Sequence, residues 1–132
     1  MAESRVPSDL YSQIGMDLIR TEESLRGIAE SGATIVFLAS DREKSSRGRT
    51  VYGECERVPD KWKWAVPCDF TVTVFEPNTE RFTDGQIRIL LLHELMHVGV
   101  ESDGNEERYY VVPHDVEDFE EIIERFGTGW SL

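Results

Sequence analysis

The chain has 132 residues, which suits one folded domain with a modest hydrophobic core. Its formal net charge of −12 argues against binding to nucleic acid or to anionic membranes, because both need a positive protein surface. No apolar run approaches the roughly 18 residues of a membrane-spanning helix.

The N-terminal third predicts a helix followed by a strand. The segment Met1–Ser8 lacks the apolar core of a signal peptide, so we expect a cytoplasmic protein. Ser8 or Asp9 is a suitable helix cap, and Ser31-Gly32 closes the element. The apolar residues between them recur at helical spacing: Leu10, Ile14, Leu18, Leu25 and Ile28. The β-branched run Ala33–Ala39 then predicts a buried strand.

The middle of the chain is polar and basic. We expect a loop over Ser40–Arg49 and a second strand over Arg49–Val58. The run Lys61–Trp64 alternates charge with tryptophan, a pattern that also occurs where single-stranded nucleic acid stacks on a protein. The acidic total favours a half-exposed strand with its indoles inward. Two cysteines, Cys55 and Cys68, make no disulfide framework, and we expect free thiols without a role in the site.

The second half predicts one strand, two helices and an acidic loop between them. Asp69–Phe75 is the clearest strand, and Glu101–Glu107 is expected to be a loop before a short strand over Arg108–Val112. Asp115 can cap a last helix that ends at Gly127. The whole pattern predicts an α+β single domain with an N-terminal helix, a small mixed sheet, a central helix and a C-terminal helix.

The central helix carries the chemistry. Its apolar run Leu90–Val98 contains the pattern H-E-x-x-H, and a capping-box sequence begins at Thr83. His93 and His97 are about one helical turn apart, so both imidazoles project from one face and can hold one Zn²⁺. Glu94 stands beside the metal, where it can take a proton from a zinc-bound water. A buried glutamate between two histidines is costly without a metal, which favours a metal site over a plain core helix.

A catalytic zinc needs three protein ligands and one open position. His114, the only remaining histidine, follows Pro113 and is the first candidate for the third ligand. The metzincin pattern fails because Val100 stands where its glycine is required. The alternatives are Asp103, which falls six residues after His97, and Cys55, which is placed like the upstream cysteine of peptide deformylases. Three glutamates of the last helix are further alternatives: Glu117, Glu120 and Glu121.

The order of these segments resembles the putative phage metallopeptidase family of zincin-like proteins, found in phages and in bacterial genomes with mobile elements. The resemblance covers nearly the whole chain and rests on a series of segments: Arg49–Cys55, Asp69-Phe70, Leu91–His97, His114–Phe119, Arg125–Gly127 and Trp130. It implies a compact zincin-like domain with His93, His97 and His114 on zinc. In such folds the strand before the metal helix lies beside the substrate. Here that strand is Asp69–Phe75, and we expect an extended peptide to add to its edge through backbone hydrogen bonds.

We therefore expect a zinc metallopeptidase that hydrolyses amide bonds with Glu94 as the general base. Tyr109 and Tyr110 precede His114 and are candidates to stabilise the oxyanion. The expected partner is a polypeptide substrate, preferably basic because the surface is acidic, with no nucleic acid and no membrane. The alternative is a non-catalytic, zinc-stabilised binding module with an acidic surface. The oligomeric state is not predicted.

Overall fold

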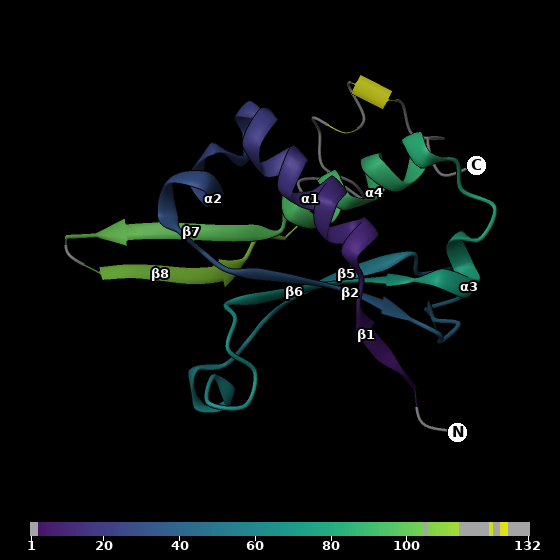
Figure 1. The fold of residues 1–132 in the computed structure, drawn as a ribbon, viewed down its shortest axis with the longest axis horizontal. Helices are drawn as coiled ribbons and strands as arrows, with labels where there is room; N and C mark the ends of the chain where they lie inside the picture. The colour runs from purple at the N-terminus through teal and green to yellow at the C-terminus, as the bar shows by residue number, and fades with distance from the viewer. Residues whose placement is uncertain (1–2, 105, 114–121, 123–124, 127–132) are drawn as a thin grey trace.

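A mixed four-stranded sheet lies at the centre of the fold, as Figure 1 shows. The computed structural model describes residues 3–104, 106–113, 122 and 125–126. The strand order is β1-β2-β6-β5; β2 and β6 run parallel, and the other two pairings are antiparallel. The strands span β1 (Arg5–Pro7), β2 (Ile35–Ser40), β5 (Gly53–Arg57) and β6 (Phe70–Phe75). The α+β class and the mixed sheet predicted from the sequence are therefore confirmed.

Three helices lie on one side of this sheet (Figure 1). They are α1 (Asp9–Thr21), α2 (Arg26–Ser31) and α4 (Asp84–Leu95). Shorter turns are the 3₁₀ segment η1 (Glu23–Leu25) and helix α3 (Glu76–Thr79). Ser8 caps α1 as predicted, since its hydroxyl accepts the Tyr11 N–H at 3.2 Å.

The prediction of one helix from Ser8 to Ser31 is wrong. The backbone of Glu22 is extended (φ −90°, ψ 123°), which separates α1 from α2. The break lets both segments pack on the sheet, because Leu18, Leu25 and Ile28 are all buried. Leu10, counted with the buried stripe from its spacing, is instead 60% exposed.

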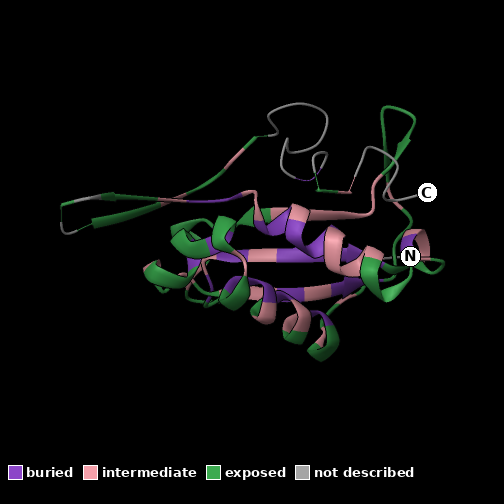
Figure 2. Ribbon diagram, turned by 90° about the horizontal axis from the view of Figure 1, so that it is seen from above, coloured by how far each residue is buried: buried purple, intermediate pink, exposed green. Residues whose placement is uncertain are grey.

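The hydrophobic core fills the space between the helices and the sheet, and Figure 2 shows the central strands as mostly buried. Phe37 of β2 packs against Gly15 of α1 so closely that a Cβ on Gly15 would lie 2.2 Å from the ring. A glycine there allows the helix to approach the strand. Strand β6 is buried along almost its whole length, and the residues between its apolar side chains are threonines.

The other face of the sheet carries an ion-pair network. Arg5 bonds to Glu54 at 2.8 Å and to Glu56 at 3.2 Å, and it also pairs with Glu3. Hydrogen bonds from Arg5 and Ser40 lower the pKa of the Glu3 carboxyl to about 2. The Arg5 guanidinium lies 5.5 Å from the centroid of the Phe75 ring, which is fully buried. Long charged side chains thus cover apolar surface on the face without helices.

The middle of the chain differs from its prediction in two places. The expected loop contains a small hairpin, β3 (Ser45–Ser46) with β4 (Arg49–Thr50), which shortens the expected second strand to β5. The expected strand over Lys61–Trp64 is wrong, since the chain instead forms the 3₁₀ turn η2 (Asp60–Trp62). Its indoles point outward, with Trp62 50% and Trp64 82% exposed.

A β-hairpin projects from the body beyond α4 (Figures 1 and 2). It consists of β7 (Val98–Asp103) and β8 (Glu106–Val111). The prediction of an acidic loop over Glu101–Glu107 is therefore wrong, although the strand predicted from Arg108 is confirmed. Glu101 stands opposite Arg108, and Gly104 takes a positive φ of 66° in the turn.

The predicted last helix lies largely outside the described residues, as does its proposed cap Asp115. Two apolar residues within the predicted helix are described: Ile122 is fully buried, and Phe126 packs against the core. No helix within the described part of the chain is long and apolar enough to cross a membrane.

Candidate metal centre

Helix α4 positions the two histidines. Its N-terminus has the predicted capping box, in which Thr83 and Gln86 each accept a backbone N–H from the other. The helix ends at Leu95, two residues before His97. The Met96 N–H still bonds to the Leu92 carbonyl at 3.0 Å, so the turn continues far enough to keep His97 one turn beyond His93.

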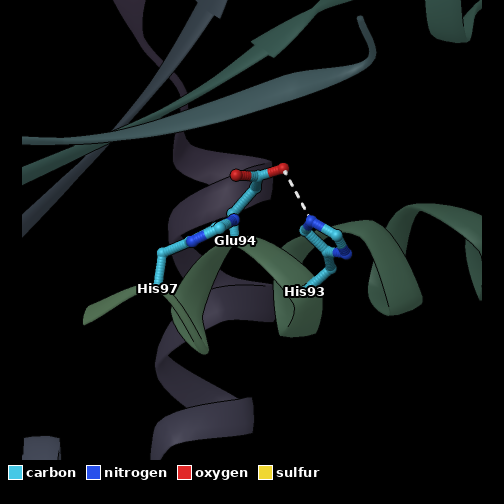
Figure 3. Close-up of side chains that lie close together, drawn as sticks. All are labelled: His93, Glu94 and His97. Carbon is cyan, nitrogen blue, oxygen red and sulfur yellow. Dashed lines mark ion pairs between the residues drawn. The ribbon is translucent and has the colours of Figure 1, made fainter. Parts of the chain in front are cut away.

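His93, Glu94 and His97 form a compact cluster at the end of α4, shown in Figure 3. One ligand atom from each residue lies within 4.8 Å of the other two, and the imidazole centroids are 5.3 Å apart. Two nitrogens bound to one tetrahedral zinc stand about 3.3 Å apart. Small rotations of the two histidine side chains therefore allow both rings to bind one ion. The donor set of two imidazoles and a carboxylate fits a zinc ion.

Glu94 is buried, with 4% of its surface exposed, and its carboxylate points toward the sheet (Figure 3). Its Oε2 lies 3.9 Å from Nε2 of His93. On the sheet side it meets Gly53, the first residue of β5, where an added Cβ would lie 3.4 Å from both Cγ and Oε2 of Glu94. Burial at such a position favours a carboxylate that has a chemical partner, because desolvation of a lone charge is costly.

His97 is oriented by the end of β8. Its Nδ1 lies 2.6 Å from the carbonyl oxygen of Val112, and the Val112 N–H donates to the His97 carbonyl. A proton on Nδ1 satisfies the first contact and makes Nε2 the ring nitrogen that can bind a metal. This contact was not predictable from the pattern of residues, because it depends on the β7–β8 hairpin, which was predicted to be an acidic loop.

The other predicted ligands divide into two groups. His114 lies outside the described residues, as do the alternatives Glu117, Glu120 and Glu121. Within the described part of the chain, Cys55 does not join the cluster of possible metal ligands, and the Asp103 side chain is not among those described. Cys55 is nevertheless a neighbour of the site, since burial and then the Glu94 charge raise the pKa of its thiol. Both cysteines are free, as predicted.

The two tyrosines point to different surroundings. The Tyr109 hydroxyl donates to Glu107 at 2.8 Å, and the ring packs edge-on against Phe70. Burial and then the hydrogen bond to Glu107 raise the pKa of Tyr109 to about 12. The Tyr110 ring lies over Gly99, where an added Cβ would be 2.5 Å away. It lines a cavity of about 290 Å³ between α2 and the hairpin.

The expectation that Asp69–Phe75 offers an edge to substrate is wrong. This segment is β6, which pairs with β2 on one side and β5 on the other, so both of its edges are occupied. The edge strand beside α4 is β5. Hydrogen bonds at both ends of its ladder, Val58 N–H to Asp69 and Phe75 N–H to Tyr52, fix which residues bond inward.

The alternation of an antiparallel ladder then decides which residues of β5 face outward. Glu54 and Glu56 lie in the hydrogen-bonded pairs with β6. Gly53, Cys55 and Arg57 therefore direct their N–H and C=O groups away from the sheet. Within the described residues, no backbone hydrogen bond joins these three to another element. The free edge of β5 begins at Gly53, in contact with Glu94.

Comparison with known proteins identifies one family. A family model described as putative phage metallopeptidase matches residues 5–131, nearly the whole chain. No curated protein and no solved structure matches the chain.

Proposed function

Because the chain belongs to the putative phage metallopeptidase family, we propose that it is a zinc-dependent peptidase with Glu94 as its general base. The family implies a metal ion and a polypeptide substrate. The observation that carries the proposal is the cluster of His93, Glu94 and His97, in which a buried carboxylate stands beside two imidazoles on one helix.

The proposed metal ligands are His93, His97 and His114. Val112, which exchanges hydrogen bonds with His97, precedes His114 by two residues. Each residue advances the chain by at most about 3.8 Å, so covalent geometry keeps the backbone of His114 within about 8 Å of Val112. That distance is within reach of a histidine side chain directed at the same metal. This supports His114 over ligands elsewhere in the sequence.

A bound zinc supplies Lewis-acid activation of water and of the scissile carbonyl. Glu94 accepts the proton of the attacking water and later passes it to the leaving amine. Gly53 leaves room for the carboxylate on the sheet side of the cluster, because an added Cβ there would lie 3.4 Å from Oε2 of Glu94. The His97 Nδ1 contact to Val112 keeps that ring oriented during the reaction. Tyr109 and Tyr110 remain the predicted hydrogen-bond donors to the oxyanion. Tyr109 can act in this way only when its hydroxyl no longer donates to Glu107.

The proposed substrate is an extended polypeptide that pairs with the free edge of β5. Backbone N–H and C=O groups of Gly53, Cys55 and Arg57 give a strand-like chain its hydrogen bonds. Because the strand starts at Gly53, beside Glu94, a paired chain passes the cluster. Backbone pairing gives weak sequence preference, and the net charge of −12 favours basic substrates.

Metal removal and restoration test the proposal. We expect the purified protein to bind about one equivalent of zinc and to cleave unfolded polypeptides, to lose cleavage with a chelator, and to regain it with zinc. His114→Ala should weaken zinc binding strongly because one of three ligands is lost, whereas Cys55→Ser should bind zinc like the wild type. Unchanged affinity in His114→Ala would reject the third ligand and direct attention to Asp103.

A further inference from the structure

The loop that follows β5 exposes an unusual amount of aromatic surface. In this segment, residues 59–67 and here named the aromatic loop, Trp64 is 82% exposed, Trp62 50% and Val66 41%. A tryptophan contributes roughly 150–250 Å² of mostly apolar surface when it is buried. Three large apolar side chains are thus exposed within five residues, and large exposed apolar surface often marks a binding site.

The aromatic loop is held in place by its charged residues. Lys63 bonds to Asp69 at 3.0 Å and to Asp60 at 3.3 Å, and its Nζ lies 5.8 Å from the centroid of the Tyr109 ring. Arg57 pairs with Asp60 at 3.4 Å. These contacts tie the loop to β6 and β8 while Trp62 and Trp64 point outward. A surface that is already ordered loses less entropy when a ligand binds.

The same contacts decide the kind of ligand. Arg57 and Lys63 are paired with acidic neighbours, and the Lys61 Nζ lies over the Trp62 ring at 5.7 Å. The cations are thus used within the protein, and the exposed surface is aromatic rather than positive. With a net charge of −12, this favours an apolar ligand over a phosphate-bearing one.

The position of the aromatic loop relative to β5 indicates which ligand it binds. The loop begins two residues after Arg57, at the end of β5 farthest from Glu94. Arg57 lies four residue steps along the strand from Gly53, a length of about 14 Å in an extended strand. A polypeptide that pairs with the β5 edge from the metal cluster outward therefore reaches the aromatic loop after about four to six residues.

We infer that the aromatic loop is a distal substrate subsite that binds an aromatic or branched apolar side chain about four to six residues from the scissile bond. This inference rests on the proposed peptidase function and adds a substrate class to it. The substrate is a polypeptide with an apolar segment at that distance, as an unfolded protein chain has.

Two peptide series test the subsite. A core peptide covers only the cleavable segment, and longer versions carry six further residues on one side or the other, with either tryptophan or serine at the distal positions. The wild type should cleave the tryptophan version of one extension with a KM about tenfold below that of its serine version, at equal kcat. A distal contact made equally in the ground and transition states acts on KM alone.

The test uses one double variant, Trp62→Ala with Trp64→Ala, and Leu10→Ala serves as the matched control. Leu10 is also an exposed apolar residue, at 60%, but lies on α1. The double variant should cleave the core peptide like the wild type and lose the tenfold preference, and Leu10→Ala should keep it. Equal preference in the double variant and the wild type, or none in the wild type, would overturn the subsite.

A binding assay separates the subsite from the proposed function. Anisotropy of a labelled tryptophan-extended peptide is measured with Glu94→Gln, alone and combined with the two tryptophan substitutions. Weaker binding of this peptide when Trp62 and Trp64 are replaced supports the subsite, and equal binding overturns it. If the wild type cleaves no peptide of either series, the peptidase proposal fails, and this assay alone decides whether the loop binds apolar polypeptides.

Discussion

At the residue scale, the chemistry of the site depends on where the Glu94 carboxylate lies relative to the two histidines and to Gly53. Two histidines one helical turn apart with a glutamate beside the first are brought together by any α-helix, so His93, Glu94 and His97 needed no knowledge of the fold. Gly53 could not be found in this way. Its contact with Glu94 exists only because β5 packs against α4, and a glycine forty-one positions upstream carries no sign of that packing.

Gly53→Ala tests whether this contact positions the general base. An added Cβ would lie 3.4 Å from the Glu94 carboxylate and 2.9 Å from the backbone oxygen of Thr73. The 3.4 Å separation from Glu94 is ordinary van der Waals contact, whereas the 2.9 Å approach to Thr73 forces β5 to shift beside Glu94. We expect kcat to fall by about tenfold to hundredfold, since small displacements of a reacting group are costly, while zinc affinity changes little. The pH dependence of kcat should also shift, because the surroundings of Glu94 change.

Gly27→Ala is the matched control, because nothing lies within 4 Å of its added Cβ. It should keep wild-type kcat and the wild-type pH profile. Melting curves for both variants show whether lost activity comes from unfolding or from a displaced Glu94 carboxylate. This control is needed because the close approach to Thr73 also strains the pairing of β5 with β6. A folded Gly53→Ala protein with unchanged kcat and pH profile would show that Gly53 does not position the base.

At the element scale, strong local signals were read correctly and weaker ones were not. The β-branched runs became β2 and β6, and the capping box began α4 as predicted. The hairpin was missed because its acidic residues obscured a turn signal, Gly104 followed by Asn105, that is typical of tight hairpins. The alternation over Lys61–Trp64 predicted a strand, but the chain forms a turn after Pro59, in which Lys63 pairs with Asp60 and Asp69.

The helix that carries the cluster offers an element-scale prediction. Thr83→Ala removes the oxygen that accepts the Gln86 N–H at 3.2 Å. Loss of an N-cap costs about 1 kcal/mol, and we expect that decrease in the free energy of unfolding, measured by urea denaturation. Thr83→Ser keeps the oxygen and should remain close to the wild type. Equal stabilities of the alanine and serine variants would mean that the cap contributes nothing to α4.

At the scale of the whole molecule, the candidate site joins three parts of the chain. Helix α4 supplies the histidines and Glu94, β5 supplies Gly53 and the free edge, and the end of β8 supplies the Val112 carbonyl. Sequence reasoning gave the helix, but it assigned the substrate to β6, because strand order depends on long-range pairing. The proposed third ligand, His114, follows directly from the β8 end of this assembly.

The most direct test of the account compares the wild type with Glu94→Gln, measuring bound zinc and the rate of peptide cleavage on the same samples. The substitution keeps the size of the side chain and removes its ability to accept a proton. The account predicts equal zinc content and cleavage at least about a hundredfold slower in Glu94→Gln, the usual scale of general-base catalysis. Equal cleavage rates at equal zinc content would contradict it.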